Sequence, residues 1–360
     1  MLRSYQLQSL EPGMVLGRDV LDSNASVLIG KGSVLTAESI ASIMDRPIFS
    51  VYIEEPDQEE SHIPGKEHLL DDEYVTLYNS VYDRVFHMFV DLLESQILDV
   101  NQLRLLVSKE IIPKLANGAR AIGQIHNMSR GGDYLIHHSI HVAILAGLMG
   151  QWKRWPNSKQ IDFVTAGLLH DVGKQLIPPD ILNKHGKLTD DEFNIIRGHA
   201  QNSYDILRYT DLSSKENILQ GVLQHHERCD GSGYPNHLTK ENIHEFALAL
   251  AVFDIYDAMA ADRAYAKRRS PWDVFEILND DMYKGKLDTE FVVYFMRNLS
   301  RALNGSWVSL SNGERGRIVY IDESRVLSLP VVQVGEDKFV DLGRDKSVKV
   351  ENILMADEVN

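Results

Sequence analysis

Apolar residues recur at intervals of three and four positions through most of this chain, which is the spacing of one helix face. From about residue 71 to 117 the pattern predicts amphipathic helices, whose apolar stripe is typical of a core or of a dimer face. From about 121 to 303 the helical pattern is almost continuous, and two polar loops interrupt it, at 178–187 and 227–241. The middle of the chain is therefore predicted to be a helical bundle.

Both ends of the chain have the shorter runs that are typical of strands and turns. Near the N-terminus strand-like runs flank a predicted helix at Ala37–Met44, and Gly30 and Gly32 favour a hairpin turn over a phosphate-binding loop. After residue 306 further strands are predicted at 316–321, 330–334 and 339–342, with a hairpin turn at 335–338. We expect a mainly α protein, an all-helical bundle flanked by a small α+β domain and a short β-rich segment. The predicted divisions are an accessory domain (1–65), connecting helices (66–120), the bundle (121–305) and the β-rich segment (306–360).

The charge of the chain limits its partners. With 37 Lys and Arg against 52 Asp and Glu, the net charge is -15, which argues against binding to DNA, RNA or an anionic membrane surface. A phosphate-bearing ligand would therefore need local positive charge. The single cysteine, Cys229, cannot form an intrachain disulfide, and no run approaches the length of a spanning helix or a signal peptide. We expect a cytoplasmic protein.

Histidine is the residue type whose distribution indicates chemistry. Eleven of the fourteen histidines fall between His126 and His244. Each one taken alone is more often a satisfied core residue than a ligand. Several helices that offer His or Asp beside apolar stretches instead describe a bundle with a polar metal pocket, because buried imidazoles and carboxylates are costly unless they bind something.

The stretch 168–174 places an imidazole, a carboxylate and an ammonium close together. The helical run that starts at Ile161 should end near Gly173 and Pro178, so His170, Asp171 and Lys174 should occupy its last turn. Such a group suits metal and phosphate chemistry, but one His-Asp pair needs further ligands from elsewhere in the chain.

Several motifs resemble the HD-GYP domains, which are bacterial cyclic-dinucleotide phosphodiesterases of the HD superfamily. The resemblance covers most of 130–300. It rests on His138-Ser139, Leu169-His170-Asp171-Val-Gly-Lys174, Ile181 to Thr189, Gly198-His199, His225-His226-Glu227 through Gly233-Tyr234-Pro235, and Asp254-Ile-Tyr-Asp257.

The resemblance implies a metal centre. Its implied ligands are His138, His170, Asp171, His199, His225, His226 and Asp254. Divided between two divalent ions, iron or manganese by the family's habit, these ligands would have Asp171 as the bridge. Some family members have a glutamate that supports a third metal, but Tyr134 stands at that position here, so we expect two metals.

The first ligand helix offers an alternative, because His137 and His141 are four residues apart and could pair on spacing alone. The alignment with the family favours His138.

The resemblance also suggests substrate contacts. Asp171 and Lys174 are the implied catalytic residues, with Lys174 on the scissile phosphate or the leaving oxygen. Further contacts would come from Gly233, Tyr234, Arg263 and Lys267.

The function that this resemblance implies is hydrolysis of cyclic di-GMP to linear pGpG and then to GMP. One alternative is another cyclic dinucleotide, such as cyclic GMP-AMP. Another is a metal-bearing sensor of nucleotide or oxygen that does not hydrolyse its ligand. A homodimer and signalling protein partners remain open.

Overall fold

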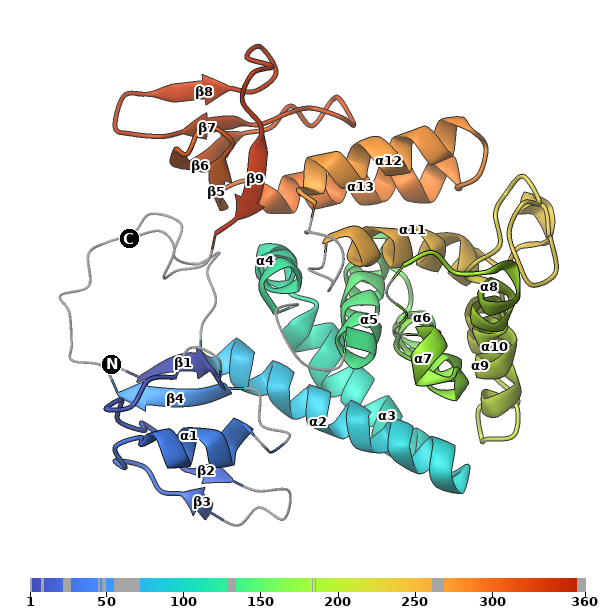
Figure 1. Cartoon of the computed structure of the whole chain (residues 1–360). Helices are drawn as coiled ribbons and strands as arrows, with labels where there is room; N and C mark the ends of the chain where they lie inside the picture. The colour runs from blue at the N-terminus through green and yellow to red at the C-terminus, as the bar shows by residue number, and fades with distance from the viewer. Residues whose placement is uncertain are drawn as a thin grey trace. The chain divides into compact units, whose positions relative to one another are not determined.

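The computed structural model describes residues 2–7, 10–21, 27–44, 46, 50–54, 72–128, 134–182, 184, 186–260 and 269–354 (Figure 1). The chain forms two compact units, residues 1–64 and 65–360. None of the described helices is long and apolar enough to cross a membrane.

The smaller unit consists of short antiparallel strands and one helix. β1 (Leu2–Gln6) pairs with β4 (Ser50–Glu54), β2 (Val20–Leu21) pairs with β3 (Val27–Ile29), and α1 spans Ala37–Met44, as predicted. The unit has its own apolar core, which includes Leu16, Leu35 and Ile43.

The glycine-rich turn in this unit is present, with Gly32 at a φ of 83° that favours glycine. The predicted hairpin is wrong, because β3 pairs with β2 and the residue after the turn, Val34, bridges to Val15.

The larger unit begins with a helical body. Its elements are α2 (Asp72–Ser95), α3 (Val100–Leu106), the π-helix η3 (Val107–Leu115), α4 (Gly118–Met128), α5 (Tyr134–Trp152), α6 (Asn157–Leu169), the 3-10 helix η4 (Val172–Leu176), α7 (Pro179–Leu182), α8 (Asp190–Arg197), α9 (His199–Leu207), α10 (Glu216–Gln224), the 3-10 helix η5 (Lys240–Asn242), α11 (Glu245–Ala260), α12 (Pro271–Tyr283) and α13 (Thr289–Leu303).

Two helices form the centre of this body. α5 is buried from Leu135 to Gly150, and α11 is buried along most of its length, as expected for helices that are apolar on every side. α5 packs against α6 and α11, while α10 packs against α6, α9 and α11 (Figure 1). Several helix starts follow from local sequence, such as the capping box of Thr189 and Glu192 at α8.

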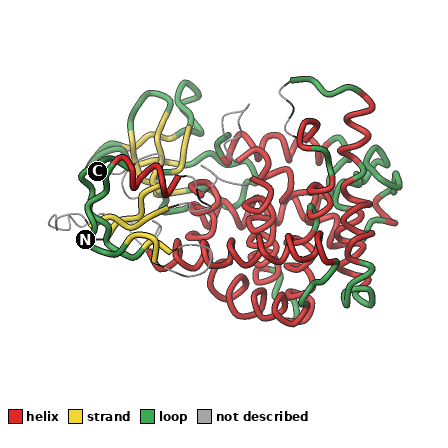
Figure 2. The backbone as a smooth tube through the Cα atoms, turned by 60° about the horizontal axis from the view of Figure 1, so that its bottom comes forward, coloured by secondary structure: helices red, strands yellow, loops and turns green. Residues whose placement is uncertain are grey.

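The tail of the chain is a five-stranded antiparallel sheet with the order β8-β7-β6-β5-β9. Its strands are β5 (Trp307–Leu310), β6 (Arg315–Tyr320), β7 (Val331–Gln333), β8 (Phe339–Asp341) and β9 (Val350–Ile353). Among the described residues of the larger unit, the strands all belong to this tail. Figure 2 colours strands yellow and helices red. The predicted fold class, mainly α with strands at both ends, is confirmed.

Candidate metal centre

All seven predicted ligands come together in the larger unit. α5 carries His138, α11 carries Asp254, His199 begins α9, and the other four lie at the ends of α6 and α10. Their ligand atoms form two groups, within each of which the atoms lie no more than 4.8 Å apart. The two groups are His138, His170, Asp171 and Asp254, and Asp171, His199, His225 and His226. Asp171 is the residue that they share.

The predicted helix end at 170–174 needs a correction. α6 ends at Leu169, His170 caps it, and Asp171 lies just beyond, while Lys174 belongs to the 3-10 helix η4. The packing of η4 is close, because a Cβ on Gly173 would lie only 2.4 Å from the carbonyl oxygen of His199. The missing side chain therefore lets η4 approach α9 and brings Asp171 near the ligand at the start of α9.

The hydrogen bonds of the histidine rings leave Nε2 atoms without a proton facing one another. Nδ1 of His170, His199 and His225 each donates to the carbonyl oxygen three residues earlier, at 2.7, 2.6 and 2.6 Å. In a neutral ring with its proton on Nδ1, Nε2 carries only a lone pair. The Nε2 atoms of His199 and His225, both in this state, are nevertheless 3.3 Å apart, and Nε2 of His170 lies 3.2 Å from Nε2 of His138. Such pairs repel unless a positive charge lies between them.

The two oxygens of Asp171 face different histidines. Oδ2 lies 3.3 Å from Nε2 of His138 and 3.4 Å from Nε2 of His170. Oδ1 lies 3.2 Å from Nε2 of His199 and 3.7 Å from Nε2 of His225. A single buried carboxylate thus contributes one oxygen to each group.

Charges in the cluster match those of a metal ligand set. Burial, together with His225 and His138, lowers the pKa of His170 to about 3 despite Asp171, so its ring is neutral near pH 7. Burial alone would raise the pKa of Asp171, but His170 and Lys174 hold it well below its usual range. For His138, burial opposes protonation, but Tyr134 and nearby carboxylates raise its pKa, and a cation can replace that proton.

The cluster fits divalent cations on its donor chemistry. Oδ1 of Asp171 and Nε2 of His226 are buried and have no hydrogen-bond partner among the described residues. Unpartnered polar atoms at such depth are costly, and a cation would satisfy them. Imidazole nitrogen with carboxylate oxygen suits iron, manganese or zinc.

The alternative pair on α5 does not join the cluster. His137 and His141 both turn to the hydroxyl of Tyr78 on α2, at 2.8 Å from Nδ1 and 3.0 Å from Nε2 respectively. Of the three α5 histidines, His138 is the one whose Nε2 approaches Asp171 and Asp254.

The predicted substrate residues have different positions. Nζ of Lys174 donates to Oδ2 of Asp171 at 2.5 Å. The ring of Tyr234 stacks on His226, with centroids 4.7 Å apart. A Cβ on Gly233 would lie 2.3 Å from the backbone nitrogen of Arg228, so the packing of the loop itself requires this glycine. Arg263 and Lys267 lie outside the described residues.

Sequence reasoning missed three residues beside the centre. Asp257, quoted in a motif but given no role, accepts from His138, and Glu227 accepts from two backbone amides of its loop. The guanidinium of Arg197 lies 5.4 Å from the centroid of the Tyr234 ring, and within the described part of the chain its buried Nε has no hydrogen-bond partner. The Arg197-Gly-His199 spacing alone carries no signal for this stacking.

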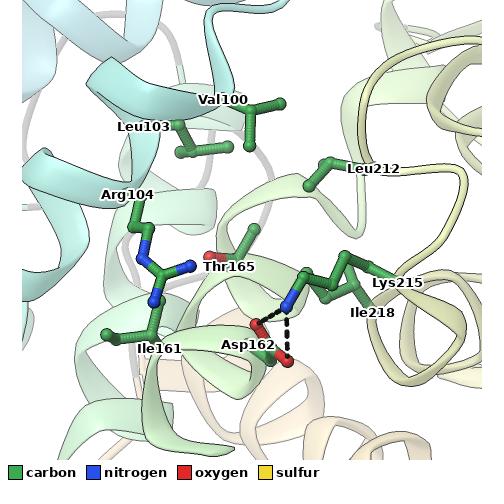
Figure 3. Close-up of a pocket in the computed structure, with 9 residues that line it drawn as sticks. All are labelled: Val100, Leu103, Arg104, Ile161, Asp162, Thr165, Leu212, Lys215 and Ile218. Atoms are coloured by element: carbon green, nitrogen blue, oxygen red, sulfur yellow. Dashed lines mark hydrogen bonds and ion pairs between the residues drawn. The ribbon is translucent and has the colours of Figure 1, made fainter. Parts of the chain in front are cut away.

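A small pocket lies apart from the metal ligands, between α3, α6 and the segment that leads into α10 (Figure 3). Its lining is largely apolar, with Leu103 and Ile218 among it, and Nζ of Lys215 is paired with the carboxylate of Asp162 at 3.3 and 3.4 Å. None of the seven clustered residues lines it, so we assign it no chemistry.

Comparisons with known proteins agree with this arrangement. Residues 132–291 match the family described as HD domain. A cyclic di-GMP phosphodiesterase from Pseudomonas aeruginosa is 33% identical over 252 residues, which is 69% of this chain and 59% of the relative. A solved HDG"Y"P protein from Bdellovibrio bacteriovorus has a TM-score of 0.54 at 14% identity, over 82% of this chain and 98% of that one. The chain belongs to the HD-GYP family.

Other relatives of this HD-GYP chain have different names. A cyclic di-GMP phosphodiesterase of Thermotoga maritima is 30% identical over 62% of this chain and 61% of the relative. A 3'3'-cGAMP-specific phosphodiesterase of Vibrio cholerae is 34% identical over 46% of this chain and 29% of the relative. The chain spans about three fifths of the Pseudomonas and Thermotoga relatives, and the likeness to the solved structure shows the fold alone.

Proposed function

We propose that this chain is a two-metal phosphodiesterase that hydrolyses cyclic di-GMP to linear pGpG, with GMP as the product of a second cleavage. The position of Asp171 carries the proposal, because its Oδ1 faces His199 and His225 while its Oδ2 faces His138 and His170. A carboxylate so placed can bridge two cations. The relatives named as cyclic di-GMP phosphodiesterases support the choice of substrate.

The proposed ligands are the seven clustered residues, and the proposed metals are iron or manganese. When bound, such ions supply Lewis acidity toward phosphate oxygens and lower the pKa of water. The protein holds the ligands in place, since three of the imidazoles are fixed through Nδ1 by backbone carbonyls. Tyr134 stands where a third metal would need a carboxylate, which favours two ions.

Lys174 is the proposed contact to the scissile phosphate or the leaving oxygen. Burial lowers the pKa of its ammonium, but Asp171 and Asp254 outweigh burial and raise it, so the side chain keeps its proton. The ammonium can then neutralise charge on a phosphate oxygen beside the shared carboxylate. Gly233, Tyr234, Arg263 and Lys267 complete the proposed substrate site.

Two other functions compete with this one. The cGAMP-specific name of the Vibrio relative favours cyclic GMP-AMP as the alternative substrate, because the same cluster would serve either phosphodiester. The second competing function is a sensor that binds nucleotide or oxygen without turnover. The complete ligand set, with Lys174 beside it, argues against a degenerate site.

The remaining assignments are proposals of the same kind. We place the protein in the cytoplasm, with residues 1–65 as an accessory domain, 66–120 as connecting helices, 121–305 as the catalytic domain and 306–360 as the β-rich segment. A homodimer or a signalling partner would provide its regulation.

A turnover assay tests the proposal. Protein reconstituted separately with Fe²⁺ and with Mn²⁺ is incubated with cyclic di-GMP or cyclic GMP-AMP, and the products are separated by chromatography. We expect pGpG to form from cyclic di-GMP faster than product forms from cyclic GMP-AMP. Faster cleavage of cyclic GMP-AMP would favour the second function, and metal-loaded protein without turnover of either would favour the sensor.

A further inference from the structure

Tyr78 has a buried hydroxyl that the proposed chemistry does not use. Its side chain is 1% exposed on α2, and the hydroxyl lies 2.8 Å from Nδ1 of His137 and 3.0 Å from Nε2 of His141. These are the two α5 histidines that spacing alone could have made a ligand pair. Both histidines are instead within hydrogen-bond distance of the Tyr78 hydroxyl.

From His141 the hydrogen bonds continue to the metal centre. Nδ1 of His141 lies 2.8 Å from Oδ1 of Asp257, and Nδ1 of His138 lies 2.7 Å from Oδ2 of the same carboxylate. Because a carboxylate only accepts, both rings donate from Nδ1. The Tyr78 hydroxyl lies between Nε2 of His141 and Nδ1 of His137, so it can donate to one ring and accept from the other.

Burial makes this chain of contacts rigid. His138, His141 and Asp257 are at most 1% exposed, so water cannot replace a lost partner. Burial would raise the pKa of Asp257, but His141 and the two hydrogen bonds lower it below its usual range, and the carboxylate stays ionised. Hydrogen bonds from outside the ligand set fix the ring of a metal-ligating histidine and raise its basicity.

We propose that Tyr78 is a positioning residue that sets metal affinity at the group containing His138, acting through His141 and Asp257. The inference rests on the proposed metal centre and adds a residue that lies outside the matched HD domain, residues 132–291. Metal affinity would thereby depend on α2, a helix that the HD domain does not contain.

The hydrogen bonds that run from Tyr78 through His141 and Asp257 to His138 form a relay. This relay ends on only one of the two ligand groups. His138 belongs with His170, Asp171 and Asp254, whereas the second group takes its imidazoles from His199, His225 and His226. Loss of the Tyr78 hydroxyl should therefore weaken one Mn²⁺ and leave the other nearly unchanged.

The test compares Tyr78→Phe with a matched variant, Tyr74→Phe. Tyr74 lies about one turn earlier on α2, is also buried, and donates at 2.9 Å to the carbonyl oxygen of Leu115, a residue that is not a member of the relay. Both variants lose one buried hydroxyl. Titration of the full-length, metal-free proteins with Mn²⁺ by calorimetry should show one binding step weakened about 10-fold in Tyr78→Phe, and both steps unchanged in Tyr74→Phe.

A second variant checks that the effect passes through His141. In a His141→Ala background the relay is already broken, so adding Tyr78→Phe should change Mn²⁺ affinity no further. An additional loss of about 10-fold in that background would overturn the proposed route.

The proposal fails if Tyr78→Phe binds both Mn²⁺ ions as tightly as wild type, or if Tyr74→Phe weakens binding equally. Wild-type protein that binds no Mn²⁺ would instead refute the metal centre itself, so failure of the relay and failure of the proposed function give different results.

Discussion

Asp171 determines more of the proposed chemistry than any other single side chain. It is fully buried, it turns one oxygen to each ligand group, and its Oδ2 also accepts from Lys174. A buried carboxylate in such surroundings is costly unless cations neutralise it. The same geometry makes Asp171 the ligand whose loss should affect both groups.

Replacing the shared carboxylate and an unshared one should have different consequences. Asp171→Asn keeps the size of the side chain but removes its charge from both groups, so we expect almost no bound Mn²⁺ and no turnover. Asp254→Asn removes a ligand from the group that contains His138 and only a 3.6 Å contact from Oδ2 to Nδ1 of His226 in the other group, so it should leave one Mn²⁺ per chain. Elemental analysis of the purified variants decides, and an Asp171→Asn protein that retains two metals would contradict the bridge.

The sequence predicted the clustered residues better than it predicted their supports. Periodicity alone could not choose among His137, His138 and His141, because all three lie on a helix that is buried on every side. The motif at His138 made the choice. Tyr78 carries no motif, and its contact with α5 depends on packing between segments about sixty residues apart, which no local pattern records.

At the scale of elements, the loop after α10 depends on one buried carboxylate. Glu227 is 2% exposed, and its two oxygens accept from the backbone amides of Asn236 and Leu238 at 2.6 and 3.0 Å. Tyr234, which stacks on His226, lies between Glu227 and Asn236 in the chain. The conformation of the loop that carries the proposed substrate contacts Gly233 and Tyr234 therefore depends on Glu227.

Glu227→Gln should loosen this loop without removing metal. Glutamine offers one acceptor, and its amide group would face a backbone N–H, so we expect a loss of about 1–3 kcal/mol in the free energy of unfolding. We also expect KM for cyclic di-GMP to rise while the Mn²⁺ content stays at the wild-type value. Chemical denaturation, steady-state kinetics and elemental analysis test these expectations.

The control lies in the same loop. Asp230→Ala removes a carboxylate that accepts from the backbone amide of Ser232 at 3.0 Å in an exposed turn. Water can replace that contact, so the effect should be smaller. Loss of Mn²⁺ from Glu227→Gln would contradict a role confined to the loop.

Element boundaries were predictable where local signals agreed. The helix at Ala37–Met44 and the strands near 316–321 and 330–342 appear close to their predicted places. The end of α6 was placed too late, because the close approach of Gly173 to α9 is a tertiary contact. β5 and β9 were not predicted as separate strands, since β9 pairs with β5 and β5 with both β6 and β9, and such pairing leaves no local pattern in the sequence.

At the scale of the whole molecule, the smaller unit has a core of its own, and the candidate metal ligands lie in the larger unit. The net charge of -15 repels an anionic ligand at long range. The proposed recognition of a cyclic dinucleotide would therefore rely on local positive charge from cations and from residues such as Lys174. The division of the larger unit into connecting helices, bundle and tail stays a prediction.

Metal binding should stabilise one unit and not the other. Cations that bind only the folded larger unit raise its free energy of unfolding with free Mn²⁺ concentration, by about 2.7 kcal/mol when the ion is at 100 times its dissociation constant. The smaller unit has its own core and contributes none of the clustered ligands, so its unfolding should not shift. Calorimetric melts of the full chain in EDTA and in rising Mn²⁺ should therefore show two transitions, of which one moves. Asp171→Asn should abolish that movement, and a shift that persists in this variant would place the stabilising Mn²⁺ elsewhere.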